Sequence, residues 1–235
     1  FGVLEYDAEF KKDALKTPWR PLLGDNVTNL LSWHTDKPDP KKPRQFIGRD
    51  NETNELLAWA EDDNPISAKF IIGKGGIGKS RLAAEFAEVL RNKGWETGFL
   101  FNERGPKNYA ASDKTLFIID YPEEKQEVVQ ELAQSLDSFS GNQRIKILLL
   151  TRDTMNEWGQ RLRQWRVGEY FETQAVQPAV LNETDCRELY NRTVYRAAKY
   201  LKKNVPSIPG WLNQWLEKDK AHQRPLFVMA AAIHS

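Results

Sequence analysis

The sequence predicts an α/β protein in which helices flank a parallel sheet and a small helical lid follows the sheet. Three observations indicate this. Apolar runs alternate with amphipathic segments from residue 45 onward, a Gly-rich loop joins one of these runs to a helix, and only helical patterns follow residue 178. We therefore expect three parts: a lead-in over residues 1–44, an α/β domain over residues 45–177 and a helical lid over residues 178–235.

The expected elements follow the periodicity of the apolar residues. Strands are predicted at residues 69–72, 98–101, 116–119 and 145–150, with a weaker fifth at 170–176. Helices are predicted between them, at residues 51–61, 79–93, 123–138 and 154–164. In the lid, Thr184 or Asp185 is expected to cap the first helix. The proline-rich lead-in is expected to dock through a group of apolar side chains, Leu22, Leu23, Leu30, Leu31 and Trp33.

The composition is that of a folded protein kept under reducing conditions. Of the 235 residues, 40% are hydrophobic, which is enough for a buried core, and the single cysteine cannot form an internal disulfide. We expect a cytoplasmic protein, with no apolar run long enough to cross a membrane. The formal net charge of +1 gives no sequence-wide reason for nucleic-acid binding, so we expect no nucleic-acid partner unless cations gather in a local patch. Because the chain opens at Phe1 and stops inside an apolar run, we expect it to be a fragment of a longer protein.

Residues 73–80, Gly-Lys-Gly-Gly-Ile-Gly-Lys-Ser, match the phosphate-binding P-loop pattern at every defined position. Such a loop and the helix N-terminus after it point backbone N–H groups at a phosphate chain. Lys79 would neutralise the β- and γ-phosphates, and the Ser80 hydroxyl would bind Mg²⁺. The sequence therefore predicts ATP or ADP with Mg²⁺ as the ligand. The expected nucleotide-binding residues of this segment are Gly73, Lys74, Gly75, Gly76, Ile77, Gly78, Lys79, Ser80 and Arg81.

Asp120 ends the expected strand over residues 116–119, where a carboxylate can hold Mg²⁺ opposite Ser80. We assign it, with Lys79 and Ser80, to the catalytic and metal-binding set, although strands also end in Asp simply because turns follow. The next residue is Tyr121, so no second acid follows directly. Glu123 or Glu124 could activate the attacking water, or both could begin a solvated helix.

Arg152 follows the expected strand over residues 145–150 and Thr151. Ligands of open α/β sheets bind at the carboxyl ends of the strands, so Arg152 is a candidate sensor of the γ-phosphate with a catalytic role. The alternative is an ordinary residue at a helix start, paired with Asp153.

These signals stand in one order: Phe46-Ile47-Gly48-Arg49 with Glu52, then residues 73–80, Phe117 to Asp120 and Leu148 to Arg152. The order resembles the STAND class of signal-transducing P-loop NTPases, relatives of AAA+ ATPases that include bacterial signalling and antiviral defence proteins. The resemblance covers about residues 45–235. It implies that Ile47, Gly48 and Arg49 cradle the adenine and that Pro225 of the lid packs near it. It also implies a winged helix after the lid, and effector and sensor domains elsewhere in a longer chain.

Two functions remain open on this basis. The first is an ATP-binding switch and oligomerisation module with slow ATP hydrolysis, which assembles into a homo-oligomer when activated and acts through the effector and sensor domains. The lack of an acid directly after Asp120 favours it. The alternative is an AAA+-type motor ATPase or loader that acts on nucleic acid with continuous hydrolysis.

Overall fold

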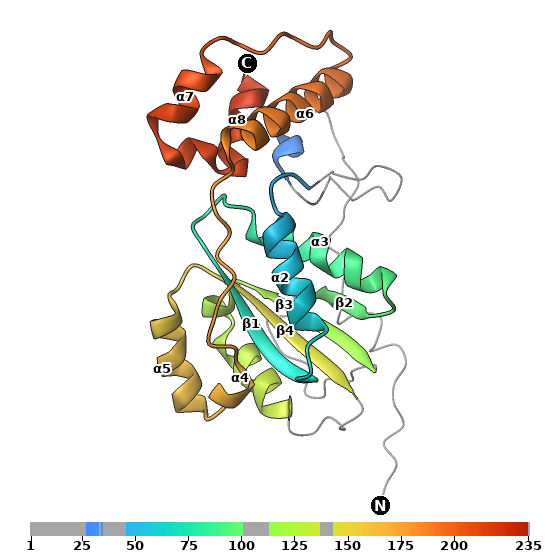
Figure 1. Ribbon diagram of the computed structural model, residues 1–235, viewed down its shortest axis with the longest axis vertical. Helices are drawn as coiled ribbons and strands as arrows, with labels where there is room; N and C mark the ends of the chain where they lie inside the picture. Colours follow the sequence, from blue (N-terminus) through green and yellow to red (C-terminus); the bar gives the residue numbers. More distant parts are fainter. Residues whose placement is uncertain (1–26, 33, 35–45, 101–112, 137–142, 235) are drawn as a thin grey trace, which may run out of the picture. The chain divides into compact units, whose positions relative to one another are not determined.

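The computed structural model describes residues 27–32, 34, 46–100, 113–136 and 143–234. These residues form two compact units (Figure 1). The sheet unit comprises residues Glu55–Ile72 and Phe86–Val176, and the loop–lid unit comprises residues 27–54, Gly73–Glu85 and 177–234, within the described ranges. Each unit has its own buried apolar core. The expected domain boundaries at residues 44 and 177 stay predictions.

The sheet unit is built on four parallel strands in the order β1-β4-β3-β2 (Figure 1). Their bounds are Ile66–Ile72 for β1, Glu96–Phe99 for β2, Lys114–Asp120 for β3 and Arg144–Thr151 for β4. Nearly every strand residue is buried, as in parallel sheets whose two faces are both covered. The four main strands expected from the sequence are confirmed, although β1 begins three residues earlier than expected and β2 and β3 each begin two residues earlier.

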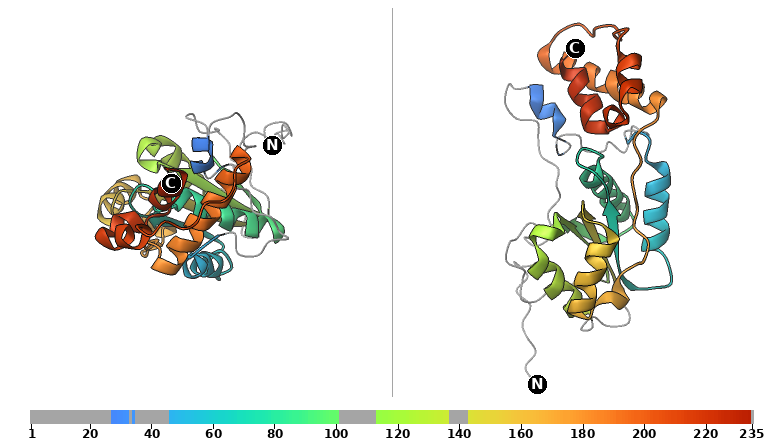
Figure 2. Two further views of the ribbon diagram at one scale, coloured as in Figure 1. Left: turned by 90° about the horizontal axis from the view of Figure 1, so that it is seen from above. Right: turned by 90° about the vertical axis from the view of Figure 1, so that its left-hand side faces the viewer.

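Helices cover both faces of the sheet (Figure 2). On one face, α4 (Gln126–Ser135) and α5 (Met155–Trp165) pack against alternate strand residues, with Trp158 fully buried beside Phe70. The other face carries the sheet-unit parts of α2 (Asp50–Ala60) and α3 (Lys79–Asn92). On this side Trp59 Nε1 donates to Ser67 Oγ at 2.9 Å. The sheet is thus the middle layer of a three-layer core.

The weak fifth strand predicted at residues 170–176 is not a regular strand. After a short 3-10 helix, η5 (Gly168–Tyr170), the chain runs beside β1 and forms two isolated parallel bridges, Ala68 with Phe171 and Ile71 with Val176. Between the bridges the segment bends away, because it contains polar Glu172, Thr173 and Gln174 where a continuous strand would bury side chains.

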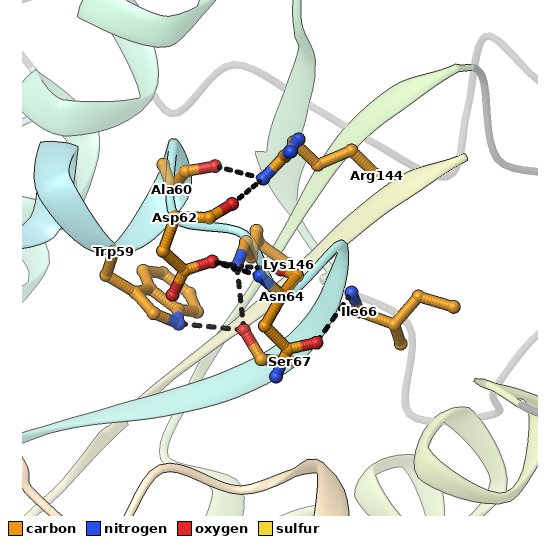
Figure 3. A network of polar contacts seen from close by, with 8 residues as sticks. All are labelled: Trp59, Ala60, Asp62, Asn64, Ile66, Ser67, Arg144 and Lys146. Atoms are coloured by element: carbon orange, nitrogen blue, oxygen red, sulfur yellow. Dashed lines mark hydrogen bonds and ion pairs between the residues drawn. The ribbon is translucent and has the colours of Figure 1, made fainter. Parts of the chain in front are cut away.

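A buried polar network joins α2 to β1 and β4 (Figure 3). Lys146 has 0% exposure, yet its Nζ donates to Asp62 Oδ1 at 2.8 Å, to Asn64 O at 2.7 Å and to Ser67 Oγ at 2.8 Å. It also lies 5.2 Å from the centroid of the Trp59 ring. Burial lowers the pKa of Lys146, an effect opposed by the bond to Asp62. All three ammonium protons therefore have an acceptor inside the fold.

The loop–lid unit contains the helices after residue 178. They are α6 (Glu183–Leu201), α7 (Leu212–Lys218), the 3-10 helix η6 (Lys220–Gln223) and α8 (Pro225–His234). Their shared core contains Tyr190, Val194, Leu212 and Val228. Cys186 is buried there, and burial raises the pKa of its thiol to about 11.

The cap of α6 is Asn182, whose side chain accepts from Asp185 N at 2.8 Å, and not Thr184 or Asp185 as predicted, because both lie inside the first turn. Of the lead-in, the short 3-10 helix η1 (Val27–Leu31) is described, with Leu30 buried. Leu22, Leu23 and Trp33 lie outside the described residues. Among the described residues, no helix is both long and apolar enough to span a membrane.

Candidate functional site

The Gly-rich loop leaves β1 after Ile72 and ends where α3 begins at Lys79. Gly76 has φ of +77° and Gly78 has φ of +96°, a backbone region that residues with a Cβ rarely adopt. Lys79 Nζ folds back over the loop and donates to Gly73 O at 2.7 Å. The lysine and the first turn of α3 therefore border the same curled backbone, which is the arrangement that binds phosphate at a helix N-terminus.

The buried side chain of Arg49 forms a hydrogen bond with this loop. Its Nη2 donates to Ile77 O at 3.0 Å, and its Nη1 donates to Glu52 Oε1 at 3.0 Å. The side chain is only 2% exposed, and burial lowers its pKa while the Glu52 carboxylate opposes that effect. The guanidinium is thus engaged with the loop carbonyl and Glu52. The adenine contact implied for Ile47, Gly48 and Arg49 stays a prediction.

The backbone at Gly48 passes close to the start of α6. Its φ is +65°, and a Cβ at this position would lie 2.5 Å from Asp185 Oδ2 and 2.8 Å from Leu181 Cδ2. Only glycine fits there, both for its conformation and for its space. The segment before α2 is therefore held against the lid helix by a contact that a larger residue would break.

The start of α8 bonds directly to the Gly-rich loop. Leu226 N donates to Gly76 O at 3.2 Å, and Arg224 Nη1 donates to Gly75 O at 3.3 Å. Pro225 lies next to Gly78, with its Cγ 3.8 Å from the position a Cβ would take. The structure thus brings the loop, Arg49 and Pro225 together in one unit. Arg224 was missed as a site residue, because its contact with Gly75 joins segments 149 residues apart in the chain.

Arg81, at the third position of α3, turns away from this loop contact. Its guanidinium pairs with Glu85 one turn later and lies 5.9 Å from the centroid of the Phe46 ring. Its expected nucleotide contact also stays a prediction.

The sheet unit carries the remaining expected site residues at the carboxyl ends of its strands. The register pairs Ile72 with Thr151 and Asp120 with Leu150, so β1, β3 and β4 end at a common edge. Tyr121 follows Asp120 with φ of 55°, and its N–H donates to Asp120 Oδ1 at 3.2 Å and to Leu150 O at 3.2 Å. The turn after β3 therefore fixes the Asp120 carboxylate at the edge from which the Gly-rich loop leaves β1.

Arg152 lies at the same edge, with its guanidinium 5.6 Å from the centroid of the Tyr121 ring. Asp153, the alternative partner expected for Arg152, pairs with another residue: its Oδ2 accepts a hydrogen bond from Arg161 Nη1 at 2.7 Å. Arg152 is exposed. Its charge is therefore held beside the end of β3 by the Tyr121 ring.

The two acids after Pro122 have different positions. Glu123 is half-buried, and its carboxylate accepts from Thr151 Oγ1 at 3.0 Å, whereas Glu124 is exposed. Both lie in a short 3-10 helix, η3 (Pro122–Glu124), and α4 begins only at Gln126, so neither acid starts that helix. Trp158 Nε1 donates to Thr151 Oγ1 at 3.2 Å and helps to orient it. Of the two candidates, Glu123 is the one placed at the strand ends.

The expected Mg²⁺ ligands, Ser80 and Asp120, belong to different units. Among the described residues, no group of three or more His, Cys, Asp and Glu side chains could hold a metal ion. This donor set still fits Mg²⁺, which keeps several waters and takes one or two protein oxygens together with phosphate oxygens.

The parallel sheet, the Gly-rich loop and the helical lid define an α/β protein with the fold of AAA+ P-loop NTPases. Among solved structures, the chain is similar to the Orc1 protein of Aeropyrum pernix in complex with DNA, with a TM-score of 0.56 and 11% identity. That similarity covers 86% of this chain and 62% of the Orc1 chain. Domain III of the replication initiation protein DnaA of Thermotoga maritima is similar with a TM-score of 0.49 and 13% identity, over 87% of each chain. No protein-family model and no curated protein sequence matches the chain.

The comparison corrects one expectation. The net charge predicts that nucleic acid is not a partner, and this is wrong as an exclusion, because a protein of similar fold is in complex with DNA. The physical reason is that net charge sums over the whole surface, whereas phosphates are bound by local groups of cations. A formal net charge of +1 therefore does not exclude such a partner.

Proposed function

We propose that the chain is the nucleotide-binding core of an AAA+-type ATPase that binds ATP with Mg²⁺ and acts on nucleic acid. One observation carries the proposal: the start of the lid helix α8 bonds to the Gly-rich loop through Leu226 and Arg224. A phosphate chain bound in the loop would compete with the loop carbonyls for the Leu226 N–H and the Arg224 guanidinium, or would move those carbonyls. Nucleotide binding and the position of the lid helix would therefore be coupled by direct contact. The complex of the Orc1 protein with DNA supports nucleic acid as the substrate class.

The residues have distinct roles in this proposal. Lys79 and the loop N–H groups bind the phosphates, Ser80 and Asp120 hold Mg²⁺, and Arg152 contacts the γ-phosphate. When bound, the metal would supply positive charge that neutralises the phosphates. Pro225 borders the loop from the lid side and would limit the space open to the nucleotide.

Lys79→Ala tests whether the Gly-rich loop binds ATP. We expect ATP binding to fall below detection in calorimetry with Mg²⁺ while the thermal unfolding of the protein stays cooperative, because this lysine contributes charge to the ligand and little to the core. Exposed Lys93→Ala, at the other end of the same loop–helix segment, is the control. Unchanged ATP affinity in Lys79→Ala would remove the Gly-rich loop from the site.

The action on nucleic acid has its own test. ATP turnover of the wild-type protein should be about 1 s⁻¹ or faster and should rise when DNA is added. Turnover that does not respond to DNA would contradict this part of the proposal.

A slow STAND-like switch is the second candidate, and two observations favour it. Asp120 is followed by Tyr121 where a second acid would support fast hydrolysis, and Pro225, which the STAND resemblance assigns to the adenine site, lies next to Gly78 of the Gly-rich loop. A switch would hold its nucleotide for many minutes and assemble on ATP in the service of signalling or antiviral defence. Release of bound nucleotide from the purified protein, measured over an hour, separates the two candidates.

A further inference from the structure

The connection between α6 and α7 has a residue order that is typical of ligands for proline-recognition domains. From Lys203 to Pro209 it reads Lys-Asn-Val-Pro-Ser-Ile-Pro, so a cation precedes two apolar-Pro pairs that Ser207 separates. Prolines three residues apart favour recognition as a polyproline II helix, which has three residues per turn. We name residues 203–209 the lid proline segment.

Proline chemistry restricts the backbone of this segment to extended conformations. The ring fixes φ of Pro206 and Pro209 at about −65°, and the residues before them, Val205 and Ile208, are pushed out of the α region. Only Ser207 among residues 205–209 is free of both restrictions. In the structure, residues 203–209 belong to no helix or strand, and the backbone of residues 204–208 forms no hydrogen bond with other described residues. A polyproline II helix likewise has no internal hydrogen bonds.

Both ends of the segment, which joins α6 to α7 (Figure 1), are fixed to the lid. Lys203 N donates to Ala198 O at 2.9 Å, which is the bond of a Schellman cap at the end of α6. Leu212 N donates to Pro209 O at 3.2 Å at the start of α7. Between these anchors every residue from 203 to 208 is exposed. The lid therefore presents the segment to solvent with both of its ends held.

Two apolar side chains of the segment are exposed although the lid has an apolar core. Val205 is 53% exposed and Ile208 is 48% exposed, whereas Leu212, just after the segment, is buried. Because Val205 and Ile208 are three residues apart, a polyproline II helix places them on one edge and the two prolines on the next. Apolar side chains that are exposed together, and not scattered singly, mark an interaction surface.

The charges close to the segment in the sequence are all basic. Lys199, Lys202 and Lys203 are exposed, and residues 189–216 include no acidic residue. In a polyproline II helix Lys203 lies one turn before Pro206, about 9 Å along the axis and on the edge that carries both prolines. A complementary groove therefore has an acidic group about one turn before its first apolar pocket.

We propose that the lid proline segment is a docking site for a domain of the SH3 type, which has an aromatic-lined groove and an acidic rim. The two apolar-Pro pairs occupy neighbouring pockets between aromatic rings, and Lys203 pairs with the acidic rim. The restricted backbone loses little conformational freedom on binding, which favours this exposed segment as a ligand. A strand of nucleic acid fits less well, because the segment has no flat ring on which a base could stack. The proposal goes beyond the proposed ATPase function and does not depend on it.

The test is titration of an isotope-labelled SH3 domain that selects Lys-x-x-Pro-x-x-Pro ligands with the whole chain, followed by NMR. We expect the shifted signals to belong to the aromatic groove. Pro206→Ala and Val205→Ser should each weaken binding by about tenfold or more, because each removes apolar contact in a pocket. Lys203→Gln should weaken binding by about two- to fivefold at low salt and change little at high salt, since an exposed ion pair is weak and screened.

The matched controls are Ser207→Ala, which lies between the two apolar-Pro pairs, and Lys202→Gln, which removes an exposed cation just outside the segment. Both should bind within about twofold of wild type. All of these positions are exposed, so every variant should keep the thermal unfolding of wild type, and a loss of binding then reports the contact itself.

The proposal is wrong if the chain leaves the groove signals unshifted, or if Pro206→Ala and Val205→Ser bind as tightly as wild type does. Self-association of the chain in sedimentation that Val205→Ser abolishes would assign the segment to an interface between copies and would also overturn the proposal. None of these outcomes bears on the binding of ATP or nucleic acid, which has its own tests.

Discussion

At the scale of single residues, the turn after β3 holds a side chain in a costly backbone conformation. Tyr121 has φ of 55°, a region that costs a residue other than glycine about 1 kcal/mol or more. In that conformation its ring lies beside the Arg152 guanidinium, a contact that contributes about 0.5–1 kcal/mol at an exposed site. The strain thus positions a permanent positive charge next to Asp120.

Arg152 should distinguish ATP from ADP. We expect Arg152→Ala to reduce ATP affinity by about ten- to a hundredfold and to leave ADP affinity nearly unchanged, because one charge-assisted hydrogen bond to the third phosphate contributes ~1.5–3 kcal/mol. Parallel calorimetric titrations with both nucleotides measure this, with exposed Arg163→Ala of the same unit as the control. Equal losses for ATP and ADP would mean that Arg152 supports the fold and does not sense the γ-phosphate.

Glu123 should serve the hydrolysis step. Its bond from Thr151 holds a carboxylate at the strand ends, where it can accept a proton from an attacking water. Glu123→Gln should lower the rate of ATP hydrolysis by about 10²- to 10⁴-fold with little change in ATP affinity, since the amide oxygen can still accept from Thr151. The exposed neighbour offers a matched control, Glu124→Gln, whose rate should stay near that of wild type. A similar loss in both variants would show that charge near the turn matters and that Glu123 has no specific role.

At the scale of elements, β4 is tied to β1 and α2 by the buried Lys146 network. Removing the ammonium leaves the carbonyl of Asn64 without this donor, whereas Ser67 Oγ keeps its bond from Trp59 and Asp62 is partly exposed and can be solvated. We expect Lys146→Met to lower the free energy of unfolding by about 2–4 kcal/mol in urea denaturation. Lys69→Met on β1 is the comparison, because Lys69 pairs with the half-exposed Glu55, and its loss should be smaller. Equal losses would show that the network adds nothing beyond the burial of a lysine.

The same network predicts a pH dependence. Burial lowers the pKa of Lys146 below the ordinary 10.5, so between the two pKa values the unfolded chain binds more protons than the folded one. Stability therefore rises with pH in that window. The difference in unfolding free energy between wild type and Lys146→Met should stay constant near pH 7 and widen as pH approaches 10.5.

The elements differ in how well the sequence predicts them. The buried strands β1, β3 and β4 are long apolar runs, so their positions follow from composition and periodicity alone. The segment at residues 170–176 has the right length, but its polar middle allows only two bridges to β1, a balance of pairing and solvation that periodicity does not measure. The cap of α6 was misplaced because Asn182, Thr184 and Asp185 all have capping side chains, and the choice depends on where the backbone turns.

The candidate site was predictable only in its local parts. The Gly-rich loop is a contiguous motif whose mechanism dictates its residues, and Asp120 follows from its place at a strand end. The bond from Arg49 to the carbonyl of Ile77 spans 28 residues, and that from Arg224 to Gly75 spans 149. Such contacts depend on how the chain packs, for which a single sequence carries no signal.

At the scale of the whole molecule, the contact between α8 and the Gly-rich loop makes the lid a part of the proposed nucleotide site. Leu226 N is an amide of the first turn of α8, and its acceptor, Gly76 O, belongs to the loop that would surround the phosphates. Binding that orders the loop should therefore also order the start of α8, even though the two segments are about 150 residues apart in the chain.

Hydrogen exchange of backbone amides measures this coupling directly. With saturating ATP and Mg²⁺, we expect exchange to slow in peptides that cover the Gly-rich loop and in those that cover residues 223–232, by about tenfold or more if binding adds ~1.4 kcal/mol or more to the stability of both segments. Peptides of α5, in the sheet unit, serve as the internal reference.

Lys79→Ala should show neither change, since it does not bind the ligand. Gly76→Ala, which places a Cβ 3.2 Å from Leu226 Cβ at a φ of +77°, should uncouple the two segments. If ATP protected the loop but not α8 in the wild-type protein, nucleotide binding would not affect the lid. The coupling between nucleotide and lid on which the proposed function rests would then be wrong.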